Sequence, residues 1–139
     1  MTVSSDRLLR CTLWGNAAFS IVSGGVLAIF AGPFARAATD APVSVMGLDL
    51  AILFELLGVG VIAFGALCAW IASRRDLPQV WAQAIFAADL AWVAGSVLAL
   101  ALPASWTTAG IAGIVVLAVI VADLAILEYL GLRRLGAAH

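Results

Sequence analysis

Four long apolar stretches separated by short polar segments form the pattern of this sequence. They cover about residues 11–32, 49–72, 79–103 and 109–132. Each is long enough to cross the hydrocarbon core of a bilayer as an α-helix, which takes about 20 residues. The pattern therefore predicts an all-α integral membrane protein, with residues 1–139 forming a single four-span domain folded as a four-helix bundle.

The composition indicates the same class. Of the 139 residues, 65% are hydrophobic and 11% are charged, whereas a soluble domain has about 45–50% and about 25%. A soluble globule of this size could not bury so much apolar surface.

The first apolar stretch also has features of a signal peptide. Arg7 and Arg10 precede it, and residues 35–37 fit a small-x-small cleavage site. Because its length is that of a full span, we interpret it as an uncleaved first span. We expect Pro33 to end this span and residues 33–48 to form the first connection.

The arginines are distributed unequally between the two sides of such a bundle. Six lie on the side that carries both termini, and only Arg36 lies on the other. The positive-inside rule then predicts that both termini are cytoplasmic, in a bacterial-type inner (plasma) membrane. Lysine is absent and no basic stripe is present, so we expect no nucleic-acid partner. The six arginines are Arg7, Arg10, Arg74, Arg75, Arg133 and Arg134.

A weak internal repeat relates the first span to the third. A shift of 71 residues superimposes several small and aliphatic residues, and each pair of spans ends in two arginines. This indicates a tandem repeat of a two-helix hairpin, with chance as the open alternative because the match is short. The matched residues are Ser20, Gly24, Val26, Leu27 and Ala28, which align with Ala91, Gly95, Val97, Leu98 and Ala99.

Small residues recur along one face of each span, and such faces let helices approach closely in lipid. These ridges predict close packing, either within one bundle or between copies in a homo-oligomer. They comprise Ser20, Gly24, Ala28 and Gly32 in the first span, Gly58 and Gly65 in the second, Ala87, Ala91, Gly95 and Ala99 in the third, and Ala118 and Ala122 in the fourth.

Two acids lie at a similar depth in neighbouring spans. Asp89 and Asp123 are each about 15 Å from the cytoplasmic end of their helix. Because a charge at that depth costs about 2.5–3.5 kcal/mol, we expect them to meet inside the bundle, with at least one neutral or both sharing a proton. Asn16 and Ser20 are candidate hydrogen-bonding neighbours, and Ser96 shares the face of Asp89. These buried polar residues, which we call the acidic level, either fix the register of the helices or bind a proton or cation.

Three further residues stand out in the spans. Glu55 is expected near the outer side, either paired with Arg36 or as an entry site for ions. Trp92 lies near mid-membrane, as a packing residue or as the wall of a site for a flat hydrophobic ligand. Glu128 is expected to be shallow and cytoplasmic, in an interfacial salt bridge with Arg10 or Arg133.

The sequence lacks the usual motifs of catalysis. No nucleophile elbow, zinc-protease motif, Walker loop or dinucleotide fingerprint is present. Cys11 and Cys68 are too far apart for a redox pair, and His139 is the single histidine. We therefore expect neither an enzyme nor a cofactor, metal site or disulfide.

Two functions remain open. The first is a small non-enzymatic membrane protein that acts through helix packing, as a homo-oligomer or an accessory subunit, and binds a lipid or another hydrophobic ligand at its acidic level. The second is a minimal proton-coupled transporter or channel that uses Asp89 and Asp123.

Overall fold

The computed structural model describes residues 3–101 and 105–136, with side chains for 7–101 and 105–134. Over these residues the chain forms five α-helices and one β-hairpin, and four of the helices are long and apolar enough to cross a membrane. The prediction of an all-α chain with four such helices is confirmed. The expected end of the third span, at Pro103, lies outside the described residues. The four long helices are α1 (Val3–Ile29), α3 (Leu50–Ser73), α4 (Gln79–Ala101) and α5 (Thr108–Gly136).

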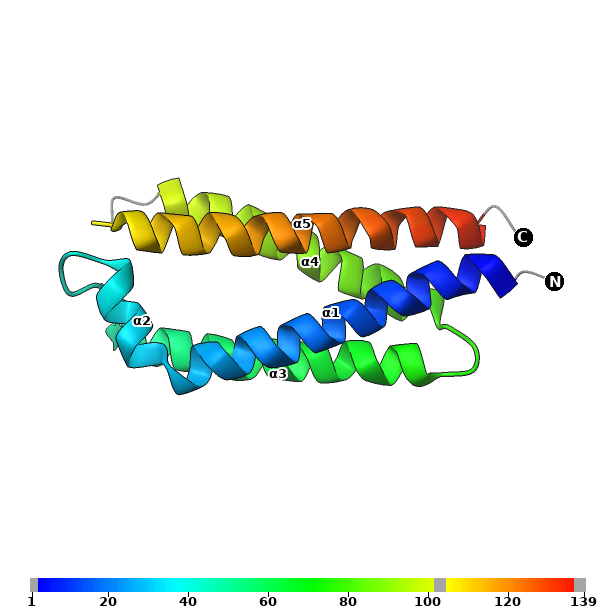
Figure 1. The fold of residues 1–139 in the computed structure, drawn as a ribbon, viewed down its shortest axis with the longest axis horizontal. Coiled ribbons are helices and arrows are strands. Elements are labelled where there is room, and N and C mark those ends of the chain that lie inside the picture. Colours follow the sequence, from blue (N-terminus) through cyan, green and yellow to red (C-terminus); the bar gives the residue numbers. More distant parts are fainter. Residues whose placement is uncertain (1–2, 102–104, 137–139) are drawn as a thin grey trace.

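The long helices form two close pairs (Figure 1). Helix α1 packs along α3, and α4 packs along α5. Helix α1 also crosses to α5, while α3 and α4 touch only slightly. The start of α1 and the end of α5 lie at one end of the molecule, which we call the terminal end, and the connection between α1 and α3 lies at the opposite end.

The first long helix ends earlier than expected. It stops at Ile29, and the short helix α2 (Ala31–Ala38) begins after a break at Phe30. Pro33 lies in the first turn of α2, where a backbone N–H would have no partner within the helix, so its absence costs nothing. If α1 continued through this point, Pro33 could not donate the helical hydrogen bond to the carbonyl of Ile29. The predicted span to residue 32 is therefore wrong by three residues. Part of the expected connection is helical.

A tight β-hairpin leads from α2 into α3. Strand β1 (Ser44–Val45) pairs antiparallel with β2 (Leu48–Asp49). The two residues between them, Met46 and Gly47, have φ values of 54° and 80°. Positive φ at both central positions is typical of the type I′ turn that suits a two-residue hairpin.

The α2 end of the molecule is closed by backbone contacts between distant segments. The N–H of Thr107 donates to the carbonyl of Ala38 at 2.9 Å, and the N–H of Asp40 donates to the carbonyl of Ser105 at 2.9 Å. Gly110 lies so close to α2 that a Cβ there would overlap the backbone of Ala38. The start of α5 is therefore held against the end of α2.

Glycines bring α1 and α3 into backbone contact. A Cβ on Gly24 would lie 2.7 Å from the carbonyl oxygen of Gly58, and a Cβ on Gly58 would lie 2.6 Å from the backbone N of Ala28. Farther along the pair, a Cβ on Gly65 would lie 3.0 Å from the carbonyl oxygen of Ala17. The small-residue ridges of the first two spans therefore pack against each other within one chain.

The ridge of the third span does not pack in this way. Ala87, Ala91 and Gly95 are exposed, and no side-chain or backbone atom of another element lies within 4 Å of the position of a Cβ on Gly95. Asp89 faces inward on the same helix, and residues two positions before and after it point about 160° away. Of the two arrangements left open for the ridges, packing within one bundle therefore does not hold for Ala87, Ala91 and Gly95.

The hydrophobic core lies in the half of the molecule nearer the terminal end. It draws on α1, α3 and α4 and includes the fully buried Cys68. Leu13 and Ile85 belong to this core and lie about one helical turn before the polar residues described below. The core residues are Leu9, Leu13, Ala17, Cys68, Ile71, Ala72, Ala82 and Ile85.

Candidate functional site

A stripe of polar side chains runs along the buried face of α1. Thr12, Asn16 and Ser20 recur every fourth residue and therefore share one face. The hydroxyl of Thr12 donates to the carbonyl of Leu8 within the helix, and the hydroxyl of Ser20 donates to Oδ1 of Asn16 at 3.1 Å. The Ser20 bond leaves the amide nitrogen of Asn16 to point toward α4 and α5.

Asn16 joins two carboxyl groups from the other helix pair. Its Nδ2 donates to Oδ2 of Asp89 at 2.7 Å and to Oε1 of Glu128 at 3.0 Å. The exposed fractions of Asn16, Asp89 and Glu128 are 1%, 3% and 0%. These three residues, together with Ser20, form a polar cluster that ties α1 to both α4 and α5.

The two carboxyl groups of the cluster share one donor, Nδ2 of Asn16, and therefore lie close to each other. Two negative charges so close in a dry interior repel each other strongly, so the pair is expected to hold at least one proton. Oε2 of Glu128 is buried and has no hydrogen-bond partner among the described residues. Oε2 of Glu128 is therefore one position at which the proton held by the pair could reside.

Asp123 lies away from this cluster. It is exposed on α5, and none of the described residues gives it a hydrogen bond or an ion pair. The expected meeting of Asp89 with Asp123 is therefore wrong. The physical reason is helical phase, because Asp123 precedes Glu128 by five residues and so points about 140° away from it.

Glu128 takes the place that was expected for Asp123. The expected interfacial salt bridge is wrong, because the side chain of Glu128 is fully buried and accepts a hydrogen bond from Asn16. The sequence contains one indication that Glu128 joins the cluster. Asn16 lies slightly nearer to the terminal end than Asp89 does, and Glu128 lies at about the depth of Asn16. The guanidinium of Arg10 donates instead to the carbonyl oxygens of Ala72 and Arg74.

The other candidate residues are outside the cluster. Glu55 is exposed on α3, and no ion pair joins it to Arg36, so that expected pairing is wrong. The hydroxyl of Ser96 donates to the carbonyl of Trp92 within α4. The indole N–H of Trp92 is buried without a partner among the described residues.

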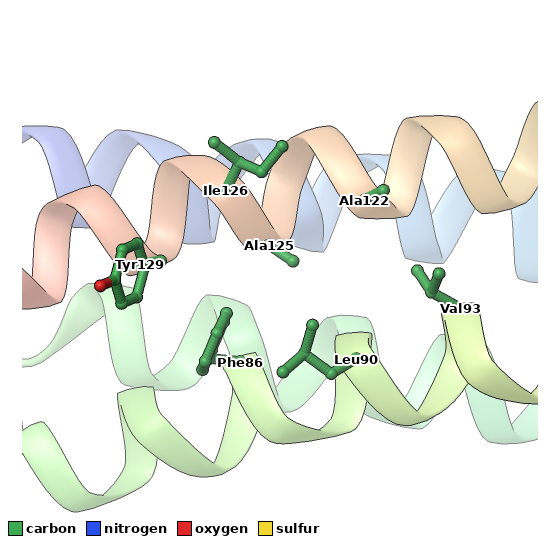
Figure 2. A pocket seen from close by; sticks show the side chains of 7 residues that line it. All are labelled: Phe86, Leu90, Val93, Ala122, Ala125, Ile126 and Tyr129. Carbon is green, nitrogen blue, oxygen red and sulfur yellow. The ribbon is translucent and has the colours of Figure 1, made fainter.

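A separate apolar groove lies between α4 and α5 (Figure 2). Its volume is about 380 Å³, and the residues that line it do not include the polar cluster. We call it the α4–α5 groove. It is lined by Phe86, Leu90, Val93, Ala122, Ala125, Ile126 and Tyr129.

The part of the chain that the structure describes contains no group of three or more histidine, cysteine, aspartate or glutamate side chains placed to hold a metal ion. Cys11 is exposed and Cys68 is buried, and both are free thiols. The site chemistry therefore consists of two carboxyl groups, one amide and one hydroxyl.

Comparison of the chain with protein-family models, with curated proteins and with solved structures gave no match.

Proposed function

We propose that this chain is a non-enzymatic protein of a bacterial-type inner membrane, with both termini cytoplasmic, that acts by binding other helices within the bilayer. It does so as a homo-oligomer or as an accessory subunit of another membrane protein. The observation that carries the proposal is Asp123, which is exposed in the middle of α5 without a partner among the described residues.

Asp123 lies far from the cytoplasmic end of α5. It lies about 16 Å along the helix from Arg134. An ionised carboxyl group facing lipid at such a depth costs about 2.5–3.5 kcal/mol. Acids within membrane spans almost always face a bundle interior or a polar partner. An assembly that covers this face of α5 would remove the cost, so Asp123 favours association.

A second exposed surface supports the proposal. Ala87, Ala91 and Gly95 form a small-residue ridge that no part of the described chain covers. Because helix association in lipid depends on close approach along small residues, this ridge is suited to a further helix. The sealed polar cluster, meanwhile, would hold the two helix pairs of each chain in register.

Energy transfer between two differently labelled populations in lipid vesicles tests self-association. We expect transfer for the wild-type protein, a strong loss for Asp123→Leu, and no loss for Ile111→Leu, an exposed position about 120° around the same helix. If the wild type shows no transfer, a stoichiometric partner should purify with it from native membranes and be lost with Asp123→Leu. A chain that is monomeric in vesicles and also purifies alone would contradict the proposal.

The second candidate function is proton-coupled transport, and the unpartnered Oε2 of Glu128 favours it. A buried carboxyl pair with one unpartnered oxygen can gain and lose a proton. For transport, the groups that exchange protons with a substrate would be Asp89 and Glu128 rather than Asp89 and Asp123. Proton uptake into vesicles that is lost with Glu128→Gln but kept with Asp123→Asn would support transport. If no proton uptake is seen across a broad substrate screen, packing remains as the only role of the two carboxyl groups.

A further inference from the structure

The α4–α5 groove has the shape of a slot with apolar walls. Ala122 and Ala125 on α5 are too small to fill the space opposite Leu90 and Val93 on α4 (Figure 2). The stacked rings of Phe86 and Tyr129, whose centres are 6.0 Å apart, form the end of the groove nearer the C-terminal end of α5. The hydroxyl of Tyr129 is the one polar side-chain group of the lining, and it points out of the groove, toward the C-terminal end of α5. Water would find few hydrogen bonds here, whereas a hydrocarbon chain would gain dispersion contacts along both helices.

A positive charge lies in line with this slot. Ala122, Ile126, Tyr129 and Arg133 follow one another at spacings of four, three and four residues, so they share one face of α5. The guanidinium of Arg133 lies 5.8 Å from the centre of the Tyr129 ring. Its side chain is exposed, and no described acidic residue forms an ion pair with it. It is therefore available to an anion at the end of the groove.

The spacing of these features matches the order of groups in a phospholipid. From Val93 to Phe86 the lining extends for about 10 Å along α4, and Arg133 lies about 6 Å beyond Tyr129 along α5. An acyl chain in the slot would therefore have its glycerol and phosphate at the level of the guanidinium. Arginine suits phosphate oxygens because its N–H groups can donate in pairs.

We propose that the α4–α5 groove binds one acyl chain of an anionic phospholipid whose phosphate contacts Arg133. The lipid site would exist even if the polar cluster and Asp123 served only in helix packing.

Native mass spectrometry of the purified full-length protein tests the site, with phosphatidylglycerol and phosphatidylcholine of identical acyl chains added separately. We expect one tightly bound phosphatidylglycerol per chain and weaker binding of phosphatidylcholine. Replacing one basic residue that contacts an anionic headgroup should weaken binding about fivefold. Arg133→Gln should therefore weaken phosphatidylglycerol binding by that factor and remove the preference between the two lipids.

A second variant tests the slot. Ala122→Phe should fill it and weaken the binding of both lipids, while Ala112→Phe, at an exposed position on α5 outside the groove, should leave binding unchanged. Arg134→Gln is the matched control for the charge. Arg133 and Arg134 are both exposed, so neither change should affect folding. Equal binding of the two lipids by the wild type, equal effects of Arg133→Gln and Arg134→Gln, or full binding by Ala122→Phe would each overturn the proposal.

Discussion

The polar cluster makes a sharp prediction for Asn16→Leu. Leucine is close to asparagine in size but can neither donate nor accept a hydrogen bond. The substitution removes the donor shared by Asp89 and Glu128 and the acceptor used by Ser20. We therefore expect the contact between α1 and the α4–α5 pair to weaken, with the helices themselves intact.

The magnitude follows from the number of bonds lost. Hydrogen bonds between membrane helices average about 0.6 kcal/mol and reach about 1.7 kcal/mol, and a buried group left unsatisfied costs about 1–3 kcal/mol. With three bonds lost and both carboxyl groups fully buried, the free energy of unfolding should fall by about 2–4 kcal/mol.

Unfolding in bicelles by steric trapping measures this free energy directly. The matched control is Thr12→Val, one turn earlier on the same buried stripe, because the hydroxyl of Thr12 bonds only within α1. It should cost no more than about 0.6 kcal/mol. If Asn16→Leu costs no more than Thr12→Val, the cluster does not join the helix pairs and the reasoning is refuted.

Three further predictions concern packing and accessibility. Gly58→Ala places a Cβ against the backbone of α1 and should cost about 1–3 kcal/mol in the same unfolding assay, whereas Gly60→Ala, which meets open space, should be nearly neutral. Thr107→Val removes a hydroxyl that accepts from the N–H of Gly110 at the start of α5 and donates to the carbonyl of Ala37 in α2. The free energy of unfolding should fall by about 1 kcal/mol, which a lower melting temperature would show. A membrane-permeant maleimide should modify Cys11 in the folded protein and Cys68 only after unfolding, and rapid modification of Cys68 in the folded state would show that the core is open.

The four spans could be predicted because membrane helices must satisfy their backbone internally, which makes span length and apolarity sufficient signals. The predicted second span, 49–72, differs from α3 by one residue at each end. The end of α1 was harder to predict, because a proline acts on the helix that precedes it. Pro33 interrupts the bond to Ile29, so the break falls before the proline rather than at it.

The candidate site could be predicted only in part. The depths of Asp89, Asn16 and Ser20 follow from the rise per residue, and these three residues do meet. Whether Asp123 or Glu128 faces the interior depends on the rotation of α5 about its axis. Apolar residues are spread evenly around α5, so the sequence does not indicate which face is buried. Depth alone therefore selected the wrong acid.

The packing ridges show a similar limit. Gly24, Gly58 and Gly65 do pack within the chain, but the equally regular ridge at Ala91 and Gly95 is exposed. Small residues indicate that a helix can be approached closely. They do not indicate whether the approaching helix belongs to the same chain.

The most direct test of the account is a distance measurement between Asn16 and Glu128 in a lipid bilayer by solid-state NMR. Asn16 is the single asparagine of the sequence, and Glu55 and Glu128 are its only glutamates, so labelling asparagine Nδ2 with ¹⁵N and glutamate Cδ with ¹³C reports on this pair without any mutation. The account predicts a strong dipolar coupling, because Nδ2 of Asn16 lies 3.0 Å from Oε1 of Glu128, while Glu55 is exposed on α3. The absence of that coupling would contradict the cluster of Asn16, Asp89 and Glu128.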